Sequence, residues 1–295
     1  MQIIIKKYER IDEEQFARLL HLCFEEEYLL SIVYSSKLKF AYSAFLNNKL
    51  IGIVIAWTSS FHPYCTYFRI LSNPLYKRLS IEEKLLSYVE NLETINFPLQ
   101  TSVWETSANL RDVYENNGFN EIRRTYMPKL KVTDVKDDGP HKSEKCVIRT
   151  LEEVISKPML VEKLALVVKR NYEKTHLVNP VVEKGLEEWK EMILADDVVP
   201  NGSYNYLGID EEDIIAYSFL HESDRKDTLE LGWCGSFETQ NKELIPQLTF
   251  QQIKYAIKHD IQFIMGEFDT TDKHAMEVLS TFPFTPCPTW ITYQK

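Results

Sequence analysis

The sequence predicts a mixed α/β fold that occurs twice in the chain. Its 295 residues are enough for two domains of roughly 100–200 residues each. The predicted elements of the two halves follow one order: a strand, helices, three strands, a helix, a strand, a helix and a strand. Two helix starts recur at a nearly constant offset, because Ser80 precedes Leu244 by 164 residues and Ser107 precedes Asp272 by 165. Such an offset indicates a duplicated domain.

The elements of the first half are predicted from the spacing of apolar residues and from the turn residues between them. Asp12 can cap a helix that runs to about Tyr28, and Asn47-Asn48-Lys49 can form a hairpin turn between two apolar runs. We expect strands at 2–8, 39–46, 50–57, 64–71, 99–104 and 119–132, and helices at 12–28, 80–92 and 107–117.

The second half repeats this order after a polar stretch at 134–145, whose Gly-Pro turn is typical of an exposed linker. We therefore divide the chain into an N-terminal domain at 1–133, a linker at 134–145 and a C-terminal domain at 146–295. Within the C-terminal domain we expect strands at 146–150, 204–209, 214–220, 229–237, 262–268 and 290–294, and helices at 159–174, 181–194, 244–258 and 272–280.

Charge is distributed unevenly between the two halves. Residues 1–140 carry 17 basic and 18 acidic side chains, whereas residues 141–295 carry 17 and 26, which gives a net charge of −10. An acidic chain lacks the basic surface that supplies most of the affinity for nucleic acids, so we expect no nucleic-acid partner. The nearly neutral first half is better suited to an anionic cofactor, and the acidic second half favours a cationic acceptor.

The chain contains no apolar run of about 18 residues, so we expect no membrane span. Its first residues lack the features of a signal peptide. The five cysteines are scattered, with neither metal-ligand spacing nor an even disulfide framework, which is typical of reduced thiols in a cytoplasmic protein. We therefore expect a cytoplasmic protein without a bound metal, and a homodimer is one assembly that we consider.

The stretch from Ser107 to Phe119 is the most informative motif. Ser107 can cap a helix, Tyr114 lies on its apolar face, and Gly118 can end it with a positive φ before Phe119 begins a strand. This pattern resembles the last helix of the GNAT N-acetyltransferase superfamily, whose element order is also similar to that of both halves. The resemblance implies two tandem GNAT-like acyl-CoA N-acyltransferase domains, with acetyl-CoA as the co-substrate.

In GNAT proteins a loop and the start of the following helix hold the pyrophosphate of acetyl-CoA through backbone N–H groups. The family pattern is Arg or Gln, two residues, Gly, one residue, then Gly or Ala, and Lys77–Glu82 stands in its place here. Lys77 matches the basic position and Ser80 the first small one, whereas Glu82 puts a carboxylate at the second. The resemblance implies cofactor contacts from Leu71, Asn73, Lys77, Arg78, Leu79, Ser80 and Ile81.

Tyr114 stands where many GNAT enzymes carry the tyrosine that protonates the leaving CoA thiolate, and a phenol is protonated at neutral pH. The second half has Leu279 at the matching position, and its loop Asn241–Pro246 contains no glycine. The resemblance therefore favours the first half as the catalytic one. Glu105, just beyond a predicted strand, is the candidate base for the acceptor amine, and Glu25, Glu26 and Glu27 at the end of the first predicted helix could line an amine pocket.

Two functions fit these residues best; a third, transfer of an aminoacyl or longer acyl group, is weaker because an acidic chain without a basic stripe argues against a tRNA donor. The first is an N-acetyltransferase that transfers an acetyl group from acetyl-CoA to a primary amine of a small molecule or peptide. The second is a catalytically silent GNAT-fold binding or regulatory protein, because both phosphate loops depart from the family pattern. Titration with acetyl-CoA would show whether either loop holds the cofactor and would separate the two functions.

Overall fold

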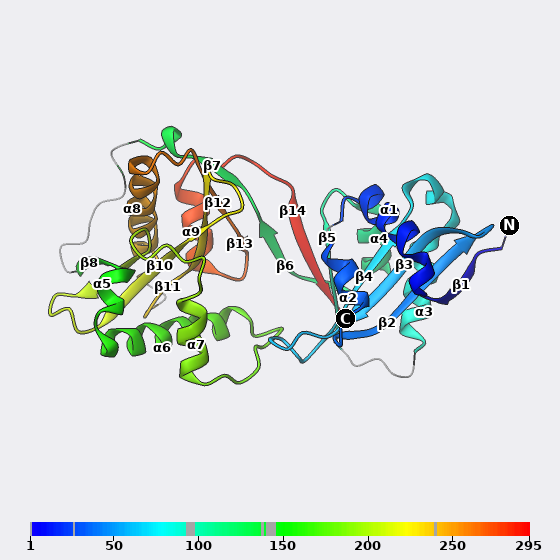
Figure 1. Cartoon of the computed structure of the whole chain (residues 1–295), viewed down its shortest axis with the longest axis horizontal. Helices are drawn as coiled ribbons and strands as arrows, with labels where there is room; N and C mark the ends of the chain where they lie inside the picture. Colours follow the sequence, from blue (N-terminus) through cyan, green and yellow to red (C-terminus); the bar gives the residue numbers. More distant parts are fainter. Residues whose placement is uncertain (1, 26, 93–97, 137–138, 140–145, 239–240) are drawn as a thin grey trace. The chain divides into compact units, whose positions relative to one another are not determined.

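The computed structural model describes the chain except for residues 1, 26, 93–97, 137–138, 140–145 and 239–240 (Figure 1). The chain forms two compact units. Unit 1 consists of Met1–Ile122, Val178–Val182 and Ile291–Lys295, and unit 2 of Arg123–Leu177 and Glu183–Trp290. Each unit is a sheet with helices on both faces, so the predicted mixed α/β class is confirmed.

Unit 1 is built on a twisted sheet with the strand order β1-β2-β3-β4-β5-β14-β6. Most neighbours are antiparallel, whereas β4 and β5 are parallel. Its elements are β1 (Ile4–Lys7), η1 (Arg10–Asp12), α1 (Glu13–Cys23), α2 (Tyr28–Val33), β2 (Leu38–Leu46), β3 (Lys49–Trp57), β4 (Thr66–Ser72), η2 (Pro74–Leu79), α3 (Ile81–Glu90), β5 (Leu99–Trp104), α4 (Ala108–Asn116), the start of β6 (Asn120–Tyr126) and the end of β14 (Thr289–Gln294).

Apolar side chains cover both faces of this sheet and define two cores. On one face, Phe16 of α1 and Leu29 of α2 pack against Ile53 and Leu71. On the other face, α3 and α4 cover Phe68 and Ile70. Alternate residues of β4 therefore face opposite helix layers, as the two-residue period of a strand requires.

Unit 2 has the strand order β7-β12-β11-β10-β9-β8, with β11 and β12 parallel. Helices α8 and α9 pack together on one face, and α6 covers the other with α7 beside it (Figure 1). Its elements are β7 (Lys129–Lys131), η3 (Val132–Asp134), β8 (Cys146–Thr150), α5 (Leu151–Ile155), α6 (Pro158–Thr175), α7 (Leu186–Ile193), β9 (Tyr204–Gly208), β10 (Ile214–Glu222), β11 (Thr228–Ser236), α8 (Leu244–Lys258), β12 (Phe263–Gly266), β13 (Phe268–Asp269) and α9 (Lys273–Thr281).

The two units exchange their last strands. The red C-terminal strand β14 ends in unit 1, where the N–H and C=O groups of Lys295 both bond to Leu99 of β5, at 3.0 and 2.8 Å (Figure 1). In the other direction, β7 lies in unit 2 and pairs with β12 through Leu130 and Ile264. The compact units therefore differ from a division into residues 1–133 and 146–295, because each half gives a strand to the other unit. Most of the predicted linker at 134–145 lies outside the described residues.

Three local expectations need correction. The predicted helix at 12–28 ends at Cys23, because Phe24 adopts a left-handed conformation with φ of 55°, and α2 follows as a separate helix. The expected strand at 119–132 is two strands, β6 and β7; β6 runs from unit 1 into unit 2, where β7 also lies. Asp12, Ser80 and Ser107 occupy N-cap positions but make no side-chain capping bond, whereas Asp272 caps α9 through two backbone N–H groups.

Candidate functional site

The two parallel central strands of unit 1 separate shortly after they begin to pair. The ladder joins Thr66 to Leu99 and Tyr67 to Gln100, and β4 continues to Ser72 without further pairing to β5. Beyond these pairs no ladder joins the two strands. Thr101 directly follows the last paired residue of β5, and Arg69 stands two residues beyond the last paired residue of β4.

Tyr114 of α4 reaches the divergence from below the sheet. Its side chain is 1% exposed, and its ring packs edge-on against Phe68, with the ring centroids 5.7 Å apart. Burial raises the pKa of Tyr114, whereas Thr101 of β5 and Arg69 of β4 lower it, and Glu25 and Glu82 add to the increase. The phenol therefore lies beside one residue of each diverging strand.

Arg69 and Glu25 form a buried ion pair on the other side of β4. Arg69 Nε lies 3.7 Å from Glu25 Oε2, with side-chain exposures of 8% and 13%. The guanidinium also lies 3.5 Å from the Tyr28 hydroxyl. Burial lowers the pKa of Arg69, but Glu25 and Tyr28 raise it and the net shift is upward. The arginine is therefore a buried cation whose charge acts on the Tyr114 phenol, and sequence reasoning missed it because a strand arginine carries no motif.

The predicted phosphate loop is a 3-10 turn rather than a glycine loop. Asn73 is buried and begins the turn by accepting a hydrogen bond from the Leu75 N–H at 3.0 Å. Lys77 and Arg78 extend into solvent, and Ser80 ends the turn with φ of 48°, the left-handed conformation for which glycine is best suited.

Of the remaining predicted cofactor residues, Leu71 and Ile81 are buried in the two cores. Leu79 is half-buried, and its carbonyl accepts a hydrogen bond from Lys84 Nζ at 2.5 Å. Only backbone groups of these residues are suited to contact a cofactor.

Glu82 occupies the first turn of α3, where a bound phosphate would need positive potential. Its side chain is 6% exposed, and its carboxylate accepts a hydrogen bond from Ser72 Oγ at 2.5 Å. Glu82 therefore points inward, toward the end of β4, and contributes to the raised pKa of Tyr114. A carboxylate of the protein, that of Glu82, therefore lies at this helix start.

Glu105 lies in the turn between β5 and α4 and is half-buried. Its backbone carbonyl accepts a hydrogen bond from Arg111 at 3.0 Å. The carboxylates whose charges reach Tyr114 are Glu25 and Glu82. Glu25, one of the three acids after the first helix that could line an amine pocket, is thus a second candidate base.

The corresponding loop of unit 2 is filled by protein side chains. Leu244, Ile245 and Pro246 at the start of α8 are all buried. Ser236 Oγ donates to the Glu238 carbonyl at 2.6 Å and lies 2.8 Å from His274 Nε2. These contacts tie the loop to α9 and leave the start of α8 covered, which agrees with a structural role.

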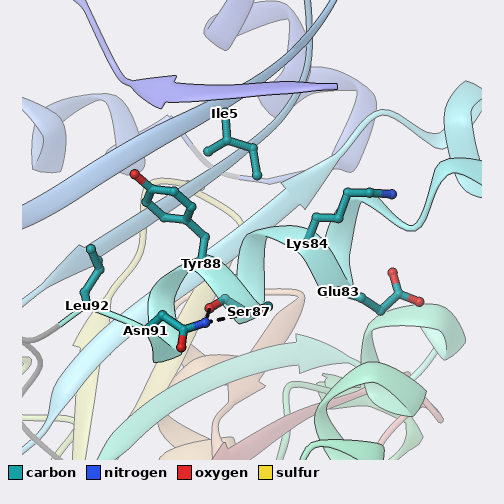
Figure 2. Close-up of a pocket in the computed structure, with 7 residues that line it drawn as sticks. All are labelled: Ile5, Glu83, Lys84, Ser87, Tyr88, Asn91 and Leu92. Atoms are coloured by element: carbon teal, nitrogen blue, oxygen red, sulfur yellow. Dashed lines mark hydrogen bonds between the residues drawn. The ribbon is translucent and has the colours of Figure 1, made fainter. Parts of the chain in front are cut away.

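Two surface cavities of unit 1 lie near these elements. One of about 250 Å³ adjoins Asn73, with Arg18 and Lys49 among the residues that line it. The other, of about 640 Å³, lies between β1 and the outer side of α3 (Figure 2). Tyr88 and Ile5 give this groove an apolar side, and Asn91 is hydrogen-bonded to Ser87 within it.

Two further surveys concern the described residues. No group of three or more His, Cys, Asp or Glu residues among them is arranged to hold a metal ion. In the same part of the chain, every helix is too short or too polar to cross a membrane. All five cysteines are free thiols, as expected from their spacing.

The chain is similar to solved structures over nearly its whole length. A GCN5-related N-acetyltransferase from Sphaerobacter thermophilus matches with a TM-score of 0.64 at 11% identity, covering 99% of this chain and 95% of that one. A tandem GNAT protein from the clavulanic acid biosynthesis pathway matches with a TM-score of 0.60 at 11% identity, covering 100% and 98%. A GNAT-family acetyltransferase from Colwellia psychrerythraea matches with a TM-score of 0.55 at 11% identity, covering 99% of this chain and 99% of that one. No protein-family model and no curated protein matches the sequence.

The chain therefore has the fold of a tandem GNAT protein, as its element order and repeated landmarks predict. At 11% identity this likeness concerns the fold alone. Activity has to be argued from the residues at the strand divergence of each unit, because one fold can carry many functions.

Proposed function

We propose that this protein is an N-acetyltransferase that transfers an acetyl group from acetyl-CoA to a primary amine of a small molecule or peptide. The observation that carries the proposal is the position of Tyr114, which packs against Phe68 of β4 and is close enough to Thr101 and to the charge of Arg69 for both to lower the pKa of its phenol. In a parallel sheet, ligands bind where neighbouring strands leave a crevice at their carboxyl ends. The proposed cofactor contacts are the backbone and basic side chains of Leu71–Ile81.

Each proposed step uses a residue of unit 1. The amine nitrogen attacks the thioester carbon, the C–N bond forms, and the C–S bond breaks with its electrons on sulfur. Backbone N–H groups of β4 polarise the thioester carbonyl. Tyr114 gives its proton to the thiolate, and Arg69 stabilises the negative charge that develops beside it. Glu105, or Glu25 beside Arg69, takes the proton that the amine releases.

One observation favours the alternative, a GNAT-fold protein that binds or regulates without transfer. Glu82 puts a buried carboxylate in the first turn of α3. A phosphate bound there would be repelled by several kcal/mol at a few ångströms and an effective dielectric of about 20, before screening by solvent. Cofactor binding is therefore the property that distinguishes the two functions.

Calorimetric titration of the full chain with acetyl-CoA tests the proposal. Replacing Lys77 and Arg78 together by Ala should weaken binding about ten-fold or more, because a hydrogen bond to a charged group contributes about 1.5–3 kcal/mol. The matched control replaces Lys6 and Lys7, two exposed cations of β1, and should leave the affinity unchanged. Absence of acetyl-CoA binding by the unchanged protein would favour the silent alternative.

A further inference from the structure

Helix α6 of unit 2 carries an arginine whose guanidinium is buried without hydrogen bonds. The Nε and Nη2 atoms of Arg170 are both enclosed by protein, and neither donates to any residue that the structure describes. Buried N–H groups almost always have a hydrogen-bond partner, and a buried charge without one is costly. An arginine held in this way is a candidate for binding an anion that the chain itself does not supply.

A cavity of about 320 Å³ lies beside this guanidinium, at the small end of the usual range for ligand pockets. The ring of Phe237 covers the guanidinium, with the ring centroid 4.3 Å from Arg170 Cζ, and is itself 50% exposed. Apolar side chains form most of the wall. The lining residues are Leu166, Val167, Lys169, Arg170, Glu173 and Phe237.

The other two charged residues of the cavity are paired with groups of the protein. Lys169 Nζ donates a hydrogen bond to the Lys184 carbonyl at 3.1 Å and lies 3.7 Å from Glu173 Oε1. The carboxylate of Glu173 is therefore next to Lys169. Within the part of the chain that the structure describes, the Nε and Nη2 groups of Arg170 remain available to a further acceptor.

Two matching hydrogen bonds show which part of unit 1 corresponds to this place. In unit 1, Cys23 Sγ of α1 donates to the carbonyl of Ser72 at the end of β4, at 3.3 Å. In unit 2, Asn171 Nδ2 of α6 donates to the carbonyl of Ser236 at the end of β11, at 3.1 Å. Ser236 follows Ser72 by 164 residues, the offset of the repeated helix starts. The end of α1 therefore corresponds to this part of α6.

Both units have a cavity at this place. In unit 1, Leu22 and Asn73, which adjoin the bonded residues, line the cavity of about 250 Å³. Arg170 and Phe237 hold the equivalent positions in unit 2 and line its cavity. Because unit 1 has leucine where unit 2 has Arg170, packing of this helix does not require a charge there. The cation is thus better explained by a ligand than by the fold.

We propose that the cavity beside Arg170 binds a small organic carboxylate that carries an apolar group. Nε and Nη2 lie on the same edge of the planar guanidinium, so their N–H groups match the two oxygens of a carboxylate. The apolar group packs against Leu166 and Val167. Phe237 turns aside to admit the carboxylate to the buried edge, and partly exposed side chains change rotamer within nanoseconds.

The cavity is less suited to other classes of ligand. A phosphate carries more charge and more acceptor oxygens than one guanidinium edge satisfies, and Glu173 repels the additional charge. A neutral apolar molecule leaves the two N–H groups of Arg170 without acceptors. The proposal goes beyond acetyl transfer by unit 1 and does not depend on it, because every residue of the cavity belongs to unit 2.

Calorimetric titration of the full chain with hexanoate tests the proposal. Hexanoate should bind with a single-site isotherm. Hexanamide, which lacks the charge, and acetate, which lacks the apolar group, should each bind about ten-fold or more weakly. Benzoate offers a flat apolar group to the same edge, and inorganic phosphate tests the other anion class. Hexanamide or phosphate binding as tightly as hexanoate would overturn the proposal, and so would absence of binding by both hexanoate and benzoate.

Variants locate the binding. Arg170→Gln should weaken hexanoate binding about ten-fold or more, whereas Lys174→Gln, which removes an exposed cation of the same helix, should have no effect. Leu166→Glu changes a residue that is 55% exposed, so the fold should tolerate it. It places a carboxylate one turn before Arg170, where it competes for the guanidinium and should also weaken binding. Far-ultraviolet circular dichroism checks that each variant is folded. Hexanoate affinity that survives Leu166→Glu unchanged would refute the proposal.

Discussion

Tyr114 shows how burial changes the acidity of a single side chain. Burial against Phe68, Phe119 and Tyr293 raises the pKa of its phenol, so the proton stays on oxygen at every working pH. The same burial makes the phenol a weaker acid. The charge of Arg69 opposes the shift without reversing it, and it would stabilise the phenolate that forms when the proton is transferred.

Tyr114→Phe removes only the hydroxyl group and tests this role directly. We expect the rate of CoA release with a competent amine to fall by about 10²–10⁴-fold, the usual contribution of general acid catalysis. The melting temperature should change little, because the ring keeps its packing. Tyr88→Phe, on the exposed side of α3, is the matched control. Unchanged turnover in the Tyr114 variant would exclude the phenol as the proton donor.

The pH dependence follows from the direction of the same shift. Because the pKa of Tyr114 lies above its usual value of about 10, the phenol should remain a proton donor up to at least pH 9.5. The transfer rate of the unchanged protein should therefore not decline between about pH 7 and 9.5 through loss of this proton. A falling limb near pH 9 that disappears in Tyr114→Phe would contradict the assignment.

At the scale of elements, the start of α3 combines close packing against the sheet with a negatively charged side chain in its first turn. The helix approaches the sheet closely at Gly52 of β3, where a Cβ atom would lie only 2.5 Å from Cγ2 of Ile81. This anchors the helix start at the end of β4, where we propose that the phosphate of acetyl-CoA binds. Glu82 lies in the first turn of this anchored helix. Its negative charge is therefore held at the end of β4 as well.

Glu82→Gln should therefore tighten binding of acetyl-CoA. The change removes the charge and keeps the size of the side chain, and relief of one like-charge pair corresponds to roughly a ten-fold gain in affinity after screening. Glu83→Gln, an exposed neighbour in the same turn, controls for the net charge of the helix. Calorimetry on both variants makes the comparison. If the Glu82 variant bound acetyl-CoA no better than the control, the phosphate would not lie at this helix start.

At the scale of the whole molecule, the exchanged strands make each unit depend on both halves of the sequence. Ile291 and Tyr293 of β14 are fully buried in the core of unit 1, together with Val103 and Tyr114. Leu130, from the first half, is fully buried in the core of unit 2. Cutting the chain at its predicted linker would remove core residues from both units.

Ile291→Ala should lower the free energy of unfolding of unit 1 by about 2–5 kcal/mol, the usual cost of truncating a buried aliphatic side chain to Ala. Ile209→Ala, at a residue that is 72% exposed, should change stability by at most about 0.5 kcal/mol. Urea unfolding followed by circular dichroism measures both. Equal effects of the two substitutions would show that β14 is not part of a core.

The sequence by itself determined the class of fold and most of its elements. Strands 99–104 and 146–150 and the helix 244–258 follow the predicted bounds, because apolar periodicity is a local property of the chain. The repeated landmarks likewise predicted the tandem arrangement. Tyr114 was singled out through its motif; the structure buries it against Phe68 of β4, and its catalytic role stays a prediction.

Only the tertiary structure decided which strands complete each unit and which residues meet at each divergence. The periodicity of β14 predicts a strand but not its partner, because pairing depends on contacts between segments nearly 200 residues apart, such as Leu99 and Lys295. Arg69 carries no sequence motif, and Glu25 was singled out only as one of three acids at the end of the first predicted helix. They are brought together by the folding of distant segments onto one sheet, which no local pattern encodes.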